Sequence, residues 1–298
     1  MSDAVDGAVD GAVDGAVDGA VDGAVDDDAL ASLASRLTTR ALGRVHRHVP
    51  ALASTNDAAM RWACEGAVHG ALVTADAQTA GRGRLGRRWS SPPGAGIYAS
   101  VIVRPPGDAR ALAWGALGLA VAVGLREGLL PWAPALALKW PNDLLHGGRK
   151  LAGILCETRW SGVGADARPQ VVVGFGINVG ACPPEVSTIA TSLARDGARA
   201  PGRAEVLARV LAALEEALDV FFGAVGRGAR AGGFAAIRER YEPHCVTLGR
   251  VISIPGPSGA RDPDRRREVR VLGLAEDGAL WVEPLAGGPR FRVDSVPP

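Results

Sequence analysis

The chain has 298 residues, of which 47% are hydrophobic and 22% are charged, a composition typical of a soluble globular protein with one substantial domain and a small one. Its formal net charge of +1 hides an asymmetry, because residues 1–28 hold nine aspartates and no lysine or arginine. The rest of the chain carries all 33 basic residues but only 23 of the 32 acidic ones, which favours an anionic ligand such as a nucleotide, or an acidic partner protein.

Three signals argue against the membrane and secreted classes. The N-terminus is acidic, unlike a secretory signal, in which a basic region precedes an apolar core. The longest apolar stretch, residues 111–125, is shorter than the roughly 20 residues that span a bilayer. The cysteines occur singly, without the spacing of a zinc site, at Cys64, Cys156, Cys182 and Cys245. We therefore expect a cytoplasmic protein with reduced cysteines and no membrane partner.

The N-terminal segment is a low-complexity repeat, since residues 5–24 contain the unit Val-Asp-Gly-Ala five times. Such a segment buries too little apolar surface to offset the entropy of ordering it, so residues 1–28 are predicted to form a disordered acidic tail. Residues 29–43 are too few for a winged helix-turn-helix before the first strand, so we expect no nucleic-acid partner.

A sheet packed by helices is predicted for residues 29–243, which makes the fold class α+β. The predicted strands are residues 45–49, 72–75, 97–103, 135–140, 151–158 and 171–179. The predicted helices are residues 54–64, with Ser54 as N-cap, residues 109–129, residues 203–222 and a further helix ending at Tyr241. Short β-rich runs after Pro243 predict a small β-barrel domain over residues 244–298.

A glycine- and arginine-rich loop, residues 80–94, is the first candidate site. Residues 81–86 match G-x-G-x-x-G, but no helix can follow through Pro92 and Pro93, so a dinucleotide fold is not indicated. The loop has four arginines in seven residues and no acid near them in the chain. Such a loop suits closure over phosphates. The alternative is a solvated basic turn.

The second candidate site contains the two lysines of the chain, Lys139 and Lys150; the other 31 basic residues are arginines. If a turn at Gly147-Gly148 pairs the flanking strands, the segments Lys139–Asp143 and Arg149–Gly153 are neighbours in space. Asn142 and Asp143 then offer an amide and a carboxylate that suit a nucleotide or a magnesium ion. The alternative is that Asn142 and Asp143 cap a turn and that Lys150 is a surface cation.

Five motifs together resemble those of biotin protein ligases, in the same order and at similar spacing. They are Ser54-Thr55-Asn56, the run Gln78–Arg87, Lys139-Trp140-Pro141-Asn142-Asp143, Arg149–Leu155 and Gly174–Val179. The resemblance covers nearly the whole chain after residue 40. It implies a mixed sheet with packed helices similar to class II aminoacyl-tRNA synthetases and lipoate ligases, plus a C-terminal domain similar to an SH3 barrel.

The resemblance also implies an activity. A biotin protein ligase activates biotin with ATP and Mg²⁺ as biotinyl-5′-AMP, releases pyrophosphate, and then transfers biotin to a lysine of a carrier protein. The implied partner is the biotin carboxyl carrier domain of an acyl-CoA or pyruvate carboxylase.

Site roles follow from the resemblance residue by residue. Lys150 and Arg84 would be catalytic, with Lys150 between the biotin carboxylate and the α-phosphate. The substrate-binding residues would be Ser54, Thr55, Asn56, Gln78, Gly81, Arg82, Gly83 and Gly153. The nucleotide would lie against Trp89, Lys139, Asn142 and Asn178, and Asp143 would hold the metal.

Acyl-adenylate chemistry requires one anion to attack another, so local positive charge and not a side-chain nucleophile is needed. The sequence agrees, since it has no G-x-S-x-G elbow and no evident Cys/His pair. Two other readings stay open. One is a lipoate ligase or octanoyl transferase, which also uses a central lysine, and the other is a non-catalytic sensor that binds DNA through its basic body.

Overall fold

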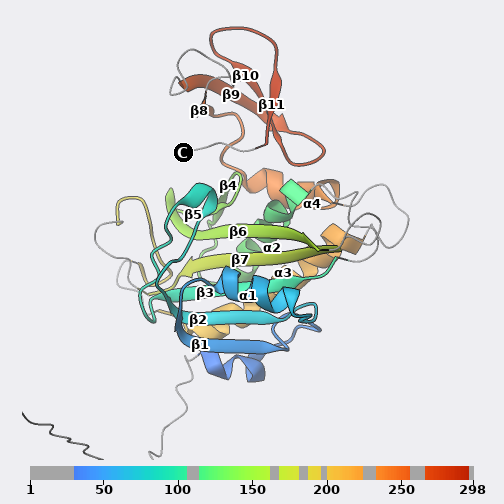
Figure 1. Ribbon diagram of the computed structural model, residues 1–298. Coiled ribbons are helices and arrows are strands. Elements are labelled where there is room, and N and C mark those ends of the chain that lie inside the picture. The colour runs from blue at the N-terminus through green and yellow to red at the C-terminus, as the bar shows by residue number, and fades with distance from the viewer. Residues whose placement is uncertain are drawn as a thin grey trace, which may run out of the picture.

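The computed structural model describes residues 30–105, 114–161, 168–180, 187–195, 200–223, 233–255 and 266–294. A seven-stranded sheet runs through the centre of the molecule, and a smaller sheet lies beyond one end of it (Figure 1). The acidic repeat and Cys182 lie outside the described residues. Within the described part of the chain, no helix is both long enough and apolar enough to cross a membrane.

The central sheet has the strand order β1-β2-β3-β7-β6-β5-β4. Its strands are β1 (His46–Leu52), β2 (Leu72–Gln78), β3 (Gly96–Val103), β4 (Ala137–Lys139), β5 (Asp143–His146), β6 (Arg149–Ser161) and β7 (Arg168–Asn178). β1 and β2 are parallel, and every other neighbouring pair is antiparallel. The predicted mixed sheet is therefore confirmed.

Helices cover both faces of the sheet. α1 (Thr55–Cys64) packs on one face over a small apolar cluster that includes Ala59, Val73 and Ile102. α2 (Leu117–Leu129), α3 (Arg203–Gly223) and α4 (Phe234–Tyr241) enclose the larger core on the other face. Strand β3 is buried along its whole length because it lies between the two layers.

The N-cap prediction is confirmed, since Ser54 is extended and its hydroxyl accepts a hydrogen bond from the Asp57 N–H at the start of α1. Helix α2 differs from its predicted range. It begins at Leu117 after a short 3-10 turn over Trp114–Ala116, and residues 109–113 lie outside the described part of the chain.

The predicted hairpin around Gly147-Gly148 is confirmed, since the turn joins β5 to β6 and Asp143 pairs with Gly153, but β5 was not predicted as a strand of its own. β4 ends at Lys139, and β5 lies between β4 and β6 in the sheet. Pro141 has no N–H to donate to a strand ladder, which accounts for the early end of β4. Lys139 and Lys150 consequently lie on non-neighbouring strands.

The C-terminal region forms a four-stranded antiparallel sheet of β8 (Val251–Pro255), β9 (Arg266–Leu274), β10 (Leu280–Pro284) and β11 (Phe291–Val293). This arrangement is consistent with the predicted small β domain. The sheet is tied to the rest of the chain through Trp140, whose indole N–H donates to the Gly278 carbonyl at 3.0 Å. The Val246 N–H donates to the Leu138 carbonyl at 2.9 Å beside it.

Candidate active site

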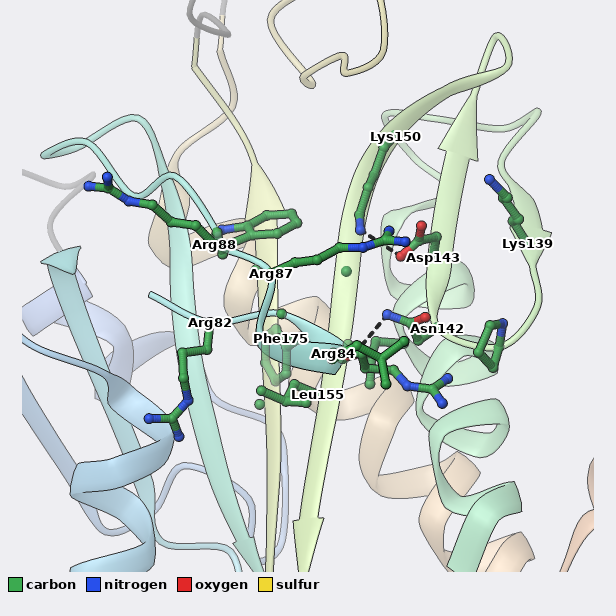
Figure 2. A pocket seen from close by; sticks show the side chains of 18 of the residues that line it. Arg82, Arg84, Arg87, Arg88, Lys139, Asn142, Asp143, Lys150, Leu155 and Phe175 are labelled. Carbon is green, nitrogen blue, oxygen red and sulfur yellow. Dashed lines mark hydrogen bonds and ion pairs between the residues drawn. The ribbon is translucent and has the colours of Figure 1, made fainter. Parts of the chain in front are cut away.

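A cavity of about 410 Å³ opens between the arginine loop, the strand ends of the central sheet and the C-terminal sheet. All but two of the predicted site residues line it, the exceptions being Gly81 and Asn178. Segments that are distant in sequence, from α1 to β8, therefore contribute side chains to one cavity. Figure 2 shows the labelled side chains around it.

The floor of the cavity is shaped by glycines of β6 and β7. A Cβ atom at Gly153 would lie 2.9 Å from the Trp89 ring, and one at Gly176 would lie 2.5 Å from it. The indole of Trp89 therefore lies against two strands that lack side chains at that point. The Trp89 indole nitrogen is buried and has no hydrogen-bond partner among the described residues, so it can donate to a ligand.

One end of the cavity is lined by uncharged polar groups. The Gln78 side-chain carbonyl accepts from the Thr55 N–H at 2.8 Å, and the Gln78 amide donates to the Ser91 hydroxyl at 2.9 Å. Ser54 and Thr55 are each 4% exposed. The predicted head-group residues Ser54, Thr55 and Gln78 are thus together in space and held in fixed positions.

The cationic side of the cavity contains Lys150, whose ammonium nitrogen lies 2.6 Å from the Asp143 carboxylate. A register shift between Leu144 and Leu145 interrupts the β5–β6 pairing next to this contact. The Lys150 nitrogen also lies 5.2 Å from the centre of the Trp89 ring, within the range of a cation–π contact. Lys150 therefore has both a carboxylate and an aromatic ring beside it at the cavity wall.

The arginines of the loop have different environments. In the view of Figure 2, Arg87 extends towards Lys150 and Asp143, Arg84 runs below Asn142, and Arg82 and Arg88 point away from this group. Burial lowers the pKa of Arg84, although the Asp143 carboxylate opposes that shift. The Arg84 guanidinium has no hydrogen bond or ion pair within the described ranges, so it is a desolvated cation available to an anion.

Arg82 corrects one expectation from the sequence. The loop has no acid near it in the chain, but in space the Arg82 guanidinium contacts Asp57 at 2.6 Å and Glu157 at 3.4 Å. Both carboxylates come from distant elements, α1 and β6, so the linear sequence gave no sign of them.

Two predicted residues support the cavity from outside its lining. The Asn178 amide donates to the Thr191 carbonyl at 2.9 Å and lies 3.4 Å from the Lys150 carbonyl, which steadies the strand end that carries Lys150. The Gly81 carbonyl accepts a hydrogen bond from the Trp89 N–H at 2.9 Å at the base of the loop.

Three further predicted residues line the cavity. Asn142 is one of them, but its amide donates to the Ile154 carbonyl at 3.1 Å. Lys139 and Gly83 also line the cavity.

Several lining residues were absent from the predicted set. Arg87 belongs to the quoted motif and could have been chosen from it. Phe175 and Leu155 form apolar lining, and their strand positions gave only a weak signal. Thr247, Ile252 and Ser253 come from the C-terminal region, and nothing in their local sequence indicates a site.

The described residues that line the cavity include no cysteine and no histidine. Burial raises the pKa of the Cys156 thiol to about 12, which keeps it protonated beside the site. Among the described residues there is no group of three or more His, Cys, Asp or Glu side chains that could hold a metal by themselves.

Comparison with known proteins places the chain in a family. Residues 49–178 match the model of the biotin/lipoate A/B protein ligase family. A biotin–[acetyl-CoA-carboxylase] ligase of Paracoccus denitrificans is 37% identical over 240 residues, which cover 78% of this chain and 92% of the relative. This chain belongs to the biotin protein ligases.

Other relatives agree with the assignment. The bifunctional ligase/repressor of Bacillus subtilis is 32% identical over 84% of this chain and 73% of its own length. A biotin–[acetyl-CoA-carboxylase] ligase of Mycobacterium tuberculosis is 43% identical, but the match covers 54% of this chain and 59% of that protein.

The fold is also that of solved biotin protein ligases. The enzyme of Aquifex aeolicus in complex with biotin and ATP superposes with a TM-score of 0.65 at 26% identity, over 85% of this chain and 97% of that one. The resemblance drawn from the five motifs is therefore confirmed, and so is the expectation of an ATP-using biotin ligase over a non-catalytic sensor.

Proposed function

We propose that this biotin protein ligase forms biotinyl-5′-AMP from biotin and ATP in the cavity of Figure 2 and then transfers the biotinyl group to a lysine of a biotin carboxyl carrier domain. The observation that carries the proposal is the placement of Lys150 and the desolvated Arg84 around one cavity whose other end is uncharged and polar. A fused-ring ureido group suits the polar end, and an anionic phosphate suits the cationic side.

In the first step a biotin carboxylate oxygen attacks the α-phosphorus of ATP and pyrophosphate leaves. Lys150 lies between the two anions and reduces their repulsion, while Arg84 and Arg87 stabilise negative charge on the phosphates. Ser54, Thr55 and Gln78 hold the ureido head, with Gly153 leaving room beneath the ligand. Trp89 and Asn142 lie against the nucleotide, and Lys139 extends the positive surface at the rim.

Asp143 is the residue we assign to Mg²⁺. A single carboxylate suits this ion, which usually keeps several waters and is bound jointly with substrate phosphates. Asp143 fits that role because it lines the same wall as Lys150. When bound there, Mg²⁺ supplies neutralisation of phosphate charge.

In the second step the ε-amine of a carrier lysine attacks the acyl carbon, an amide bond forms and AMP leaves. The mixed anhydride must be shielded from water until the carrier docks. The loop that bears Arg84 and Trp89 lines the cavity and is the segment we assign to this shielding. The carrier's name follows from the relatives, which are biotin–[acetyl-CoA-carboxylase] ligases.

The test measures pyrophosphate release from ATP and Mg²⁺ with biotin, lipoate or octanoate supplied separately, followed by addition of a carrier domain and mass spectrometry. We expect turnover with biotin alone and one biotinyl group per carrier. Preference for lipoate would reject the head-group assignment of Ser54, Thr55 and Gln78 while leaving the fold argument intact.

A further inference from the structure

Arg82 lies at the base of the arginine loop and is held by a carboxylate of α1. Its two terminal nitrogens donate to the two oxygens of Asp57 at 2.6 and 2.7 Å. Paired parallel hydrogen bonds of this kind fix the orientation of a guanidinium as well as its position. The side chain of Arg82 is 39% exposed and that of Asp57 33%, so the contact is near the surface but directional.

A second carboxylate joins the contact from β6. Glu157 lies 3.4 Å from the Arg82 guanidinium, and its other oxygen accepts a hydrogen bond from the Asn56 amide at 2.7 Å. The Asn56 amide also donates to the Leu155 carbonyl at 3.1 Å, and its oxygen accepts from the Ser100 hydroxyl at 2.6 Å. Every polar atom of the Asn56 side chain is thus engaged within the protein.

The space around Asn56 confirms that its position is fixed. Asn56 is 5% exposed, and a Cβ atom on Gly174 of β7 would lie 1.9 Å from its side-chain oxygen. A continuous set of contacts therefore leads from the buried Asn56 through Glu157 to Arg82. Asp57, Glu157, Asn56 and Arg82 are called the loop clamp below.

The loop clamp acts on the part of the loop that reaches the cavity. Arg82 and Arg88 face each other in an antiparallel bridge, and the Gly83 N–H donates to the Arg87 carbonyl at 2.7 Å. The residues between them, including Arg84, form the tip of a small hairpin. Holding Arg82 fixes the base of that hairpin and hence the direction in which its tip extends.

We propose that Asp57 and Glu157 are positioning residues of this ligase, which hold Arg82 so that Arg84 and Arg87 are directed at the anionic substrates. The proposal assigns Arg82 and Asn56 to this support and not to contact with the ligand. It rests on the proposed function for its catalytic consequence, but its structural part stands by itself. The hydrogen bond from Arg82 lowers the pKa of Asp57, so this carboxylate stays charged at neutral pH.

The first experiment is limited trypsin digestion without substrates, with cleavage after Arg84, Arg87 and Arg88 as the readout, because all variants keep these three sites of the loop. Asp57→Asn and Arg82→Asp should be cut in the loop about three- to tenfold faster than the parent chain, since the base of the hairpin is released. The charge-swapped pair Arg82→Asp with Asp57→Arg should regain slow cleavage. Equal cleavage rates in all variants would overturn the structural part of the proposal, whether or not the protein ligates biotin.

The second experiment measures how long biotinyl-5′-AMP stays bound, by rapid gel filtration, together with KM for ATP and kcat. We expect Asp57→Asn and Glu157→Gln to lose the intermediate about three- to tenfold faster and to raise KM more than they lower kcat, with partial rescue by the charge swap. The control is Glu283→Gln, which breaks the exposed 3.9 Å pair with Arg270 on the C-terminal sheet and should change neither readout.

Two outcomes of the two experiments together, with Arg82→Asp included in both, separate the alternatives. If Arg82→Asp loses activity and the charge swap restores slow cleavage but no retention, Arg82 contacts the substrate directly and the positioning role is wrong. If the parent chain forms no adenylate at all, the proposed function fails and the cleavage result still decides whether the loop clamp exists.

Discussion

At the scale of the residue, Lys150 is the cation on which the proposed chemistry depends most. It pairs with Asp143, so the lysine is held beside the cavity before any substrate contact is made. We predict that Lys150→Met lowers the rate of biotin-dependent pyrophosphate release by about 10² to 10³, because a preorganised positive charge is removed from the site of developing phosphate charge. The midpoint temperature of thermal unfolding should change little in this variant, since the Lys150 side chain is 31% exposed. Lys150→Arg is the matched control for charge, and near-parental release by Lys150→Met would contradict the assignment.

At the scale of the element, strand β7 and the loop meet through Trp89. Gly176 leaves room for the indole, and an added Cβ would lie 2.5 Å from the ring. We predict that Gly176→Ala displaces Trp89 and lowers kcat/KM for ATP by about 10- to 100-fold, because a shift of about 1 Å is costly in a preorganised site. Steady-state kinetics with varied ATP measures the effect. Gly273→Ala is the matched control, since a Cβ there meets nothing within 4 Å. An unchanged kcat/KM in Gly176→Ala would show that the indole position is not required.

At the scale of the whole molecule, Glu215 of α3 fastens the N-terminal segment to the core. Its carboxylate accepts hydrogen bonds from the N–H groups of residues 40, 41 and 42 at 2.7, 2.8 and 3.0 Å. Burial raises the pKa of Glu215, but these hydrogen bonds outweigh burial and the net pKa is lowered. The stabilisation is therefore complete above the ordinary carboxyl pKa and is lost as the pH falls through the lower folded value. We predict that Glu215→Gln reduces the free energy of unfolding by about 1 to 3 kcal/mol at pH 7 and that the difference shrinks below about pH 4. Denaturant unfolding of the parent chain and of Glu215→Gln, at pH 7 and below about pH 4, measures this difference in the free energy of unfolding. A difference that does not change with pH would refute the prediction.

Much of the central fold could be predicted, because local patterns indicate it. Alternating or continuous apolar runs located the strands of the sheet, and Ser54 marked the start of α1 correctly. The hairpin at Gly147-Gly148 could also be predicted, because glycines mark the turn. The division of the preceding segment into β4 and β5 could not, because it depends on how each piece pairs within the whole sheet.

The candidate site, like the fold, could be predicted in part. The motif residues that carry charge or a polar head could be selected from the sequence, and most of them line one cavity. The partners of Arg82 could not be selected from the sequence, since Asp57 and Glu157 are 25 and 75 residues away from it in the chain. Asn56 was assigned to the ligand because it belongs to a motif, whereas its hydrogen bonds are all made within the protein.

The sequence by itself determined the class of the molecule and its family, because hydrophobic periodicity and short motifs are local properties of the chain. The tertiary structure alone decided which charges neutralise one another, where Lys150 and Asp143 form a pair and where Arg84 is left desolvated. It also decided that the C-terminal sheet supplies part of the cavity wall through Thr247, Ile252 and Ser253. The physical reason is that electrostatic energies and burial depend on distances between atoms, and folding brings together atoms that the chain keeps far apart.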